Sequence, residues 1–356
     1  MDGEARWRDE RAALDGARAR LGEVADGLYP DVPRVAGTPL RCADGWVPDA
    51  PVPLGDVRLA WDPAPPPPAV AAPPDGLPPG YRTYAEALGA LAPPAVFEDR
   101  PAYRLVAVEP PADRPVLRLS PARYFDGVNV GEAVAHELAA GRRGLRDRIG
   151  DPCDLARRTA LPAITTVTLT ASGTYLLHRR DPAKVAHAGG LLQVMPVGVF
   201  QPLRAADERR DLDLWRCMVR EYAEEVLGRD EDYGAAFDQD AWPFHRALTA
   251  ARTAGRARAH LLGIGVDPLT LALDVLTAVV FDDDAFAELF GDAVEVNAEG
   301  EVARAPFDGT VPAPMQPAGA AALELAWRHR EALRVTPSPV SPSPVSPRPV
   351  SPPRGP

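Results

Sequence analysis

The sequence has very little lysine and a shortage of basic charge. Lys184 is the only lysine among 39 basic residues, and this preference for arginine indicates a high-G+C bacterial genome. Acidic residues number 50, which gives a formal net charge of −11. Binding to nucleic acid or to an anionic membrane surface relies on basic protein surface, so neither is expected.

Long apolar runs and paired cysteines are also missing. No stretch of about 18 apolar residues occurs, so no membrane-spanning helix is expected. The charged N-terminal segment MDGEARWRDERAALDG lacks the apolar core of a signal peptide. Cys42, Cys153 and Cys217 are far apart and match no metal-binding spacing. We therefore expect reduced thiols in a cytoplasmic protein.

Proline, in contrast, is abundant, with 42 among 356 residues, and half of it lies in two tracts. The first tract, residues 47–80, includes four consecutive prolines and predicts an extended linker, because proline donates no backbone hydrogen bond. The second tract, residues 336–356, repeats Pro-Val-Ser-Pro-x three times and predicts a disordered polyproline-II tail. Such a tail is either inert or a ligand for a proline-binding module.

An amphipathic helix is predicted before the first tract. Trp7, Leu14, Leu21 and Leu28 recur every seven residues, which favours a helix over residues 4–28 within an N-terminal segment 1–30. Its apolar stripe could dock on a partner, but docking on its own domain is the simpler interpretation.

The residues between the two tracts are expected to form the folded body. An α+β extension is assigned to 81–160, with strands and helices at 103–108, 115–119, 131–140 and from 145 onward. The pair His136-Glu137 resembles the start of a zinc-protease motif, but the second histidine is absent.

A second domain is assigned to residues 161–333. Alternating β-branched residues on either side of a short turn predict a hairpin. The expected elements are strands at 164–170, 174–180 and 190–199, a helix at 214–228, strands at 260–266 and 274–281, and a helix at 318–333.

Three glutamates on the predicted helix 214–228 are the main candidates for chemistry. At helical spacing Glu221, Glu224 and Glu225 fall within an arc of roughly 100°. Like charges at these spacings repel by about 0.2–0.5 kcal/mol per pair, so a solvated face would more often interleave cations. Carboxylates that share one face suit a hard divalent cation such as Mg²⁺.

These residues resemble the Nudix family, whose signature ends in Arg-Glu-U-x-Glu-Glu-x-Gly-U, where U is bulky and apolar. The matching segment is Arg220-Glu221-Tyr222-Ala223-Glu224-Glu225, with the closing glycine one place late at Gly228. The preceding hairpin and the strand GLLQVMPVG also follow the family's order.

The resemblance implies a fold, a cofactor and a set of site residues. It implies that Glu221, Glu224 and Glu225 hold Mg²⁺, or Mn²⁺, at the phosphates of a nucleoside diphosphate derivative and carry catalysis. It also implies that Arg220 braces the surrounding loops and that Gly198 lies at the substrate. Arg179 and Arg180 could bind phosphate oxygens through their planar forks, or could be ordinary surface arginines.

The first half of the signature differs from the family. Leu212 stands where the family has a glutamate, between Asp211 and Asp213, and Ala206 stands where it has a glycine. The acidic run 282–284 could supply a further ligand or a base, or could be the acidic start of a helix.

We therefore expect an α/β fold, a Nudix-like mixed-sheet α/β/α sandwich with an N-terminal extension and a disordered tail. The leading functional hypothesis is a Mg²⁺-dependent hydrolase of a nucleotide-linked diphosphate. The alternative is a catalytically inactive nucleotide-metabolite sensor or adaptor, and a third is a protein-interaction scaffold that uses the terminal segments. A homodimer is left open.

Overall fold

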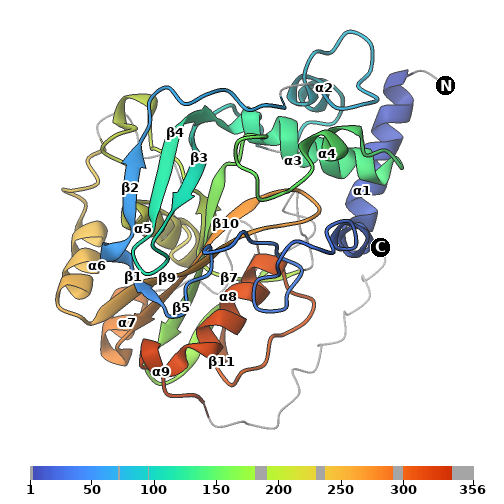
Figure 1. The fold of residues 1–356 in the computed structure, drawn as a ribbon. Helices are drawn as coiled ribbons and strands as arrows, with labels where there is room; N and C mark the ends of the chain where they lie inside the picture. Colours follow the sequence, from blue (N-terminus) through green and yellow to red (C-terminus); the bar gives the residue numbers. More distant parts are fainter. Residues whose placement is uncertain are drawn as a thin grey trace, which may run out of the picture.

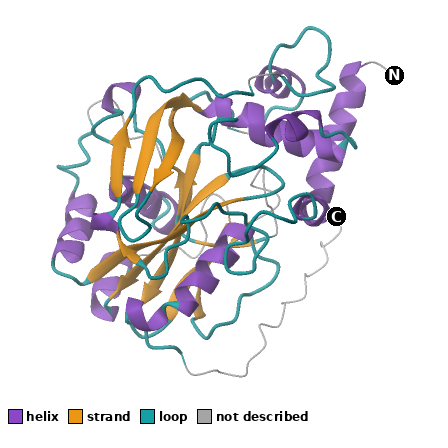
Figure 2. Ribbon diagram, in the orientation of Figure 1, coloured by secondary structure: helices purple, strands orange, loops and turns teal. Residues whose placement is uncertain are grey.

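The computed structural model describes residues 3–70, 73–94, 96–180, 191–229, 237–291 and 300–338 (Figure 1). Within them the chain is a mixed α/β protein whose helices surround two β-sheets (Figure 2). None of the helices in these ranges is both long enough and apolar enough to cross a lipid bilayer.

The larger sheet has eight strands and is mixed. β10 and β5 are parallel, and every other pair is antiparallel. The order across the sheet is β1 (Val52–Pro53), β9 (Ala257–Val266), β10 (Leu273–Phe281), β5 (Pro162–Thr170), β6 (Thr174–Arg180) and β11 (Gly300–Pro306), while β7 (Leu192–Val194) pairs with β6 and β8 (Val197–Val199) with β5.

The centre of this sheet is covered on both faces. Every residue of β10 is buried, in keeping with its largely apolar sequence. On one face Thr168 of β5 hydrogen-bonds to Tyr222. On the other face Tyr175, which pairs with Leu169, packs on Phe307 next to α8 (Pro317–Arg328). Because neighbouring strand residues point to opposite faces, helices lie on both sides of the sheet (Figure 1).

The smaller sheet corrects the expectation of an extended linker at 47–80. It contains β2 (Arg58–Trp61), β4 (Val116–Arg123) and β3 (Pro101–Glu109), in that order. β2 and β1 both come from the expected linker, and Val52 and Leu54 are buried. The segment Val52–Trp61 contains few prolines, so its backbone can pair with other strands. Edge strands also tolerate the N–H donors that proline lacks.

The N-terminal helix is confirmed and docks on the chain itself. α1 (Gly3–Asp26) packs on α3 (Tyr124–Ala139), and Leu14 and Leu21 of the predicted stripe are buried there with Leu138. The short helices α2 (Tyr84–Leu91) and α4 (Gly144–Ile149) flank α3 (Figure 1).

Other sequence-based expectations hold in part. The strands β3, β4, β5, β6, β9 and β10 lie where they were predicted, whereas the single strand expected at 190–199 is divided into β7 and β8. The helix expected at 318–333 is α8 followed by α9 (Arg330–Leu333). The strand β11 and the helix α6 (Pro243–Thr253) were not predicted, and α7 (Asp283–Phe290) was expected only under the helical interpretation of the acidic run 282–284.

The core continues across the expected boundary between residues 160 and 161. Leu105 of β3 donates its N–H to the carbonyl of Ala160, and Tyr103 packs on Phe200. One cluster of buried apolar side chains extends from Trp7 to Val335.

The start of the expected tail is part of the fold. Thr336 donates its N–H to Ala171, and Ser338 donates its hydroxyl to Gly173 in the β5–β6 turn. This corrects the expectation of disorder for 336–338, and residues 339–356 lie outside the described ranges.

Replacing Leu14 tests the docking of α1. The side chain is fully buried, so Leu14→Ala should lower the free energy of unfolding by about 2–5 kcal/mol in urea denaturation. Val24→Ala on the same helix, where Val24 is 48% exposed, should stay within about 0.5 kcal/mol of wild type. Equal effects of the two substitutions would contradict the docking.

Candidate functional site

The carboxylate helix begins at a side-chain cap and ends in a π-helical turn. α5 (Leu214–Glu221) starts at Asp213, whose carboxylate accepts the N–H groups of Trp215 (2.7 Å) and Arg216 (3.1 Å). The turn Tyr222–Val226 continues it, with the N–H of Leu227 bonded to the carbonyl five residues earlier. Such turns occur frequently at functional sites.

Tyr222 anchors this turn to the larger sheet. Its ring packs edge-on against Phe281 and tilted against Phe290, with centroids 6.1 and 5.2 Å away. Its hydroxyl hydrogen-bonds to that of Thr168 at 2.7 Å. Burial raises the pKa of Tyr222, so the hydroxyl stays neutral, and the anchor fixes the height of the neighbouring glutamates over the sheet.

Two of the three glutamates rest on the backbone of β8. Glu225 accepts the N–H of Val197 at 3.0 Å. A Cβ atom at Gly198 would lie 2.0 Å from Cδ of Glu221, so only glycine permits this approach. Glu224 lies on the same turn, and all three side chains are half-buried. The structure thus brings Gly198 together with the carboxylate helix.

Arg220 connects the helix to the loops on either side. Its side chain is buried, and it donates to the carbonyl of Gln201 (2.7 Å) and to Oε1 of Gln239 (2.9 Å). Gln239 in turn donates to the carbonyl of Arg216 at 2.8 Å. These contacts hold the segment before the helix and the segment before α6 against the helix.

The two aspartates beside Leu212 have structural partners. Asp211 is buried, accepts the N–H of Leu203 at 2.9 Å and pairs with Arg216 at 3.3 Å. Asp213 is the cap of α5. Neither carboxylate is therefore placed to replace the signature glutamate.

The acidic run 282–284 forms the start of α7, as the helical interpretation expects. Asp282 pairs with Arg258 at 2.8 Å, and Asp284 pairs with Arg256 at 3.2 Å. Asp283 accepts a hydrogen bond from Ser172. Each of these three carboxylates thus has a partner at the same end of the sheet.

Arg179 does not share a face with the glutamates. Alternation along β6 places it on the face of Tyr175, which α8 covers, whereas the carboxylate helix lies on the face of Thr168. The side chain of Arg180, the next residue, lies outside the described part of the chain.

The three glutamates of the carboxylate helix could hold a metal ion only together with ligands from outside this set. Within the described ranges, no three His, Cys, Asp or Glu side chains come close enough together to hold a metal ion. Mg²⁺, however, is commonly held by one or two carboxylates together with waters and substrate phosphates. The oxygen donors of Glu221, Glu224 and Glu225 suit such a partial site.

The pair His136-Glu137 has a structural role. Glu137 is buried and accepts the N–H groups of Asp75 (2.6 Å) and Leu145 (2.9 Å). Burial, followed by the charge of Arg11, lowers the pKa of His136 to about 4. The histidine is therefore neutral and packed among aromatic rings, against Trp7 and Tyr84.

Asp274 is a buried acid that the sequence pattern did not reveal. It lies on β10 and accepts the hydroxyl of Thr165 at 2.8 Å. Thr165 shares the face of Leu169 and Tyr175, opposite to the carboxylate helix. Burial raises the pKa of Asp274 to about 7. From the sequence pattern alone, Asp274 is an ordinary polar residue at the start of a predicted strand.

No protein-family model matches the chain, and no curated protein matches it.

The contact between Gly198 and Glu221 predicts the cost of adding one methyl group. Gly198→Ala must displace the glutamate, so the free energy of unfolding should fall by about 1–3 kcal/mol. The matched control is Gly22→Ala in α1, where no atom lies within 4 Å of the new Cβ. That substitution should be neutral or stabilising by up to about 1 kcal/mol. A wild-type stability for Gly198→Ala would refute the contact.

Asp274 predicts a pH dependence of stability. The folded protein keeps this proton up to about pH 7, whereas an unfolded carboxyl loses it near pH 4. Its contribution is therefore full below about pH 4 and is lost as the pH rises toward 7.

Asp274→Asn retains an oxygen acceptor for Thr165 and removes the charge. It should raise the free energy of unfolding at pH 8 by about 1–3 kcal/mol and have a much smaller effect at pH 5. Urea denaturation at both pH values measures this, with the exposed Asp44→Asn as control. The same change at both pH values would contradict the assignment.

Proposed function

We propose that the chain is a Nudix-type, Mg²⁺-dependent hydrolase of a nucleotide-linked diphosphate. The observation that carries the proposal is the placement of Glu221 and Glu225 on the backbone of β8 at a π-helical turn. Carboxylates at repelling spacings, positioned by specific backbone contacts, indicate a cationic ligand more than a solvated surface.

The chain's own residues have separate roles in this proposal. Glu221 and Glu225 are the principal metal ligands, and Glu224 is a ligand or a base that accepts a proton from water. Val197 fixes one oxygen of Glu225 through its N–H. When bound, Mg²⁺ would offset the charge of the phosphate oxygens and lower the pKa of the attacking water.

The surrounding residues position this set. Gly198 gives Glu221 its place because the strand backbone carries no side chain there. Arg220 fixes the flanking loops from a buried position through the carbonyl of Gln201 and Oε1 of Gln239, so its proposed role is structural. Arg180, whose side chain lies outside the described part of the chain, is the proposed phosphate-binding arginine.

Hydrolysis of nucleoside diphosphate-linked compounds in the presence of Mg²⁺ tests the proposal. Glu225→Gln keeps an oxygen acceptor for Val197 and removes the charge, so turnover should fall by about 10²-fold or more. Glu23→Gln, at an exposed position on α1, is the matched control and should retain full turnover. Equal turnover by Glu225→Gln and wild type would contradict the assignment of Glu225 as a metal ligand.

A second candidate function is a Nudix-like module that binds a nucleotide metabolite without cleaving it. It is favoured by the structural use of Asp211 and Asp213, which leaves the signature glutamate position without an acidic replacement. Nucleotide-induced stabilisation in a thermal-shift measurement, with no product after long incubation, would support this function over the hydrolase. Product formation that depends on Glu225 would exclude it.

We also propose a cytoplasmic location. Cys42, Cys153 and Cys217 are all buried free thiols, and burial raises the pKa of Cys42 and of Cys153, the latter to about 12. Cysteines that remain free thiols are typical of a reducing compartment, and a raised pKa keeps such thiols unreactive.

A further inference from the structure

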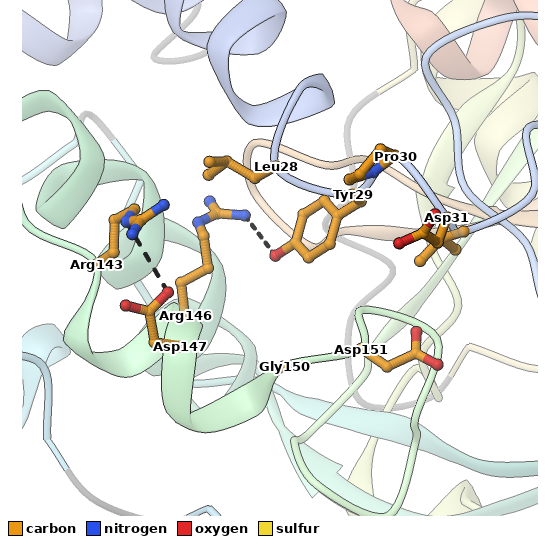
Figure 3. A pocket seen from close by; sticks show the side chains of 10 residues that line it. Leu28, Tyr29, Pro30, Asp31, Arg143, Arg146, Asp147, Gly150 and Asp151 are labelled. Carbon is orange, nitrogen blue, oxygen red and sulfur yellow. Dashed lines mark hydrogen bonds and ion pairs between the residues drawn. The ribbon is translucent and has the colours of Figure 1, made fainter.

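A cavity of about 340 Å³ lies away from the carboxylate helix, between the segment that follows α1 and the helix α4. Figure 3 shows it from close by. Its charged and polar walls come from Tyr29, Asp31, Arg143, Arg146, Asp147 and Asp151. Its volume is that of a site for a small molecule.

Arg146 is a buried cation whose acceptors are all neutral. The side chain is 2% exposed. It donates to the hydroxyl of Tyr29 (2.9 Å) and to the carbonyls of Pro268 and Leu269 (2.5 Å each). Its Nε–H has no partner among the described residues, and no carboxylate there forms an ion pair with it. A buried charge of this kind is costly unless an anion pairs with it.

The remaining charge on the α4 wall is largely cancelled. Arg143, which directly precedes α4, forms an ion pair with Asp147 of this helix, with 3.9 Å between Nε and Oδ1 (Figure 3). The charge left for a ligand on this wall is therefore that of Arg146, next to the hydroxyl of Tyr29.

The opposite wall is negative. Asp31 and Asp151 lie across the cavity from Arg146 and Arg143 (Figure 3). Asp31 is exposed and makes no ion pair within the described ranges. Asp151 is also exposed, and one of its oxygens accepts the N–H of Cys153 at 2.8 Å. The cavity thus carries opposite charges on two walls, and the apolar Leu28 and Val32 also line it.

We infer that this cavity binds a small zwitterion of the α-amino acid class. Its carboxylate pairs with Arg146 and accepts a hydrogen bond from the Tyr29 hydroxyl, and its ammonium group lies toward Asp31 and Asp151. A simple anion would meet these two carboxylates, and a simple cation would meet Arg146. Only a ligand with both charges matches both walls, and Leu28 and Val32 offer contact for an apolar side chain.

This site is separate from the proposed hydrolase centre. Its walls belong to the segment 28–32 and to residues 143–151, whereas the carboxylate helix lies on β8. Arg146 also connects it to the turn between β9 and β10 through Pro268 and Leu269. The inference therefore stands whether or not the protein hydrolyses nucleotides.

Ligand-observed NMR and calorimetry with the full chain test the inference. The probes are the twenty common α-amino acids, each paired with its des-amino carboxylic acid. At least one amino acid should bind, and its des-amino partner should bind at least tenfold more weakly. Binding by none of the twenty, or equal binding by the acid that lacks the ammonium group, would overturn the proposal.

Variants at the two walls complete the test. Asp31→Asn lies at an exposed position and should fold normally, and it should weaken binding of that amino acid at least tenfold. Arg146→Lys, checked for folding by circular dichroism, should also weaken it. Glu23→Gln, an exposed change outside the cavity, should leave the affinity unchanged. Wild-type affinity in Asp31→Asn would overturn the assignment even if Arg146→Lys failed to fold.

Discussion

Two carboxylates of one helix rest on the backbone of a three-residue strand, and the candidate site depends on this contact. Glu225 accepts the N–H of Val197, and Glu221 occupies the space that a side chain at position 198 would fill. Tyr222 holds the helix at this height by packing on Phe281. Two glutamates at a repelling spacing are thereby positioned at the same strand, which has a physical purpose if a cation is bound there.

The rest of the fold supports this contact from outside. The parallel pairing of β5 with β10 brings Thr168 and Phe281 to the same face, where Tyr222 meets both. Arg220 holds the loops on both sides of the helix. The N-terminal region joins the main core and adds, between the segment after α1 and the helix α4, a charged cavity that is distinct from the carboxylate helix in place and in chemistry.

The sequence predicted the elements with strong local patterns and missed features that depend on tertiary contacts. The hairpin, the carboxylate helix and α1 follow from residue periodicity, and all three are present. The pairing of β1 with β9 and of β2 with β4 was missed, because the prolines of this segment hide short strands that distant partners complete. The local spacing of residues also did not reveal the ion pair of Asp211 with Arg216. Nor did it reveal the burial of Asp274 and Arg146, because long-range packing creates it. The resemblance placed Gly198 at the substrate, whereas its contact with Glu221 became visible only in the folded chain.

Binding of Mn²⁺, followed by electron paramagnetic resonance, tests the central claim most directly because it does not require the substrate to be known. Bound Mn²⁺ loses the sharp signal of the free ion, so a titration counts the sites. We predict a site in the wild-type chain that is lost when Glu221→Gln and Glu225→Gln are combined and is retained in Glu23→Gln. Equal Mn²⁺ binding by wild type and the double variant would contradict the account.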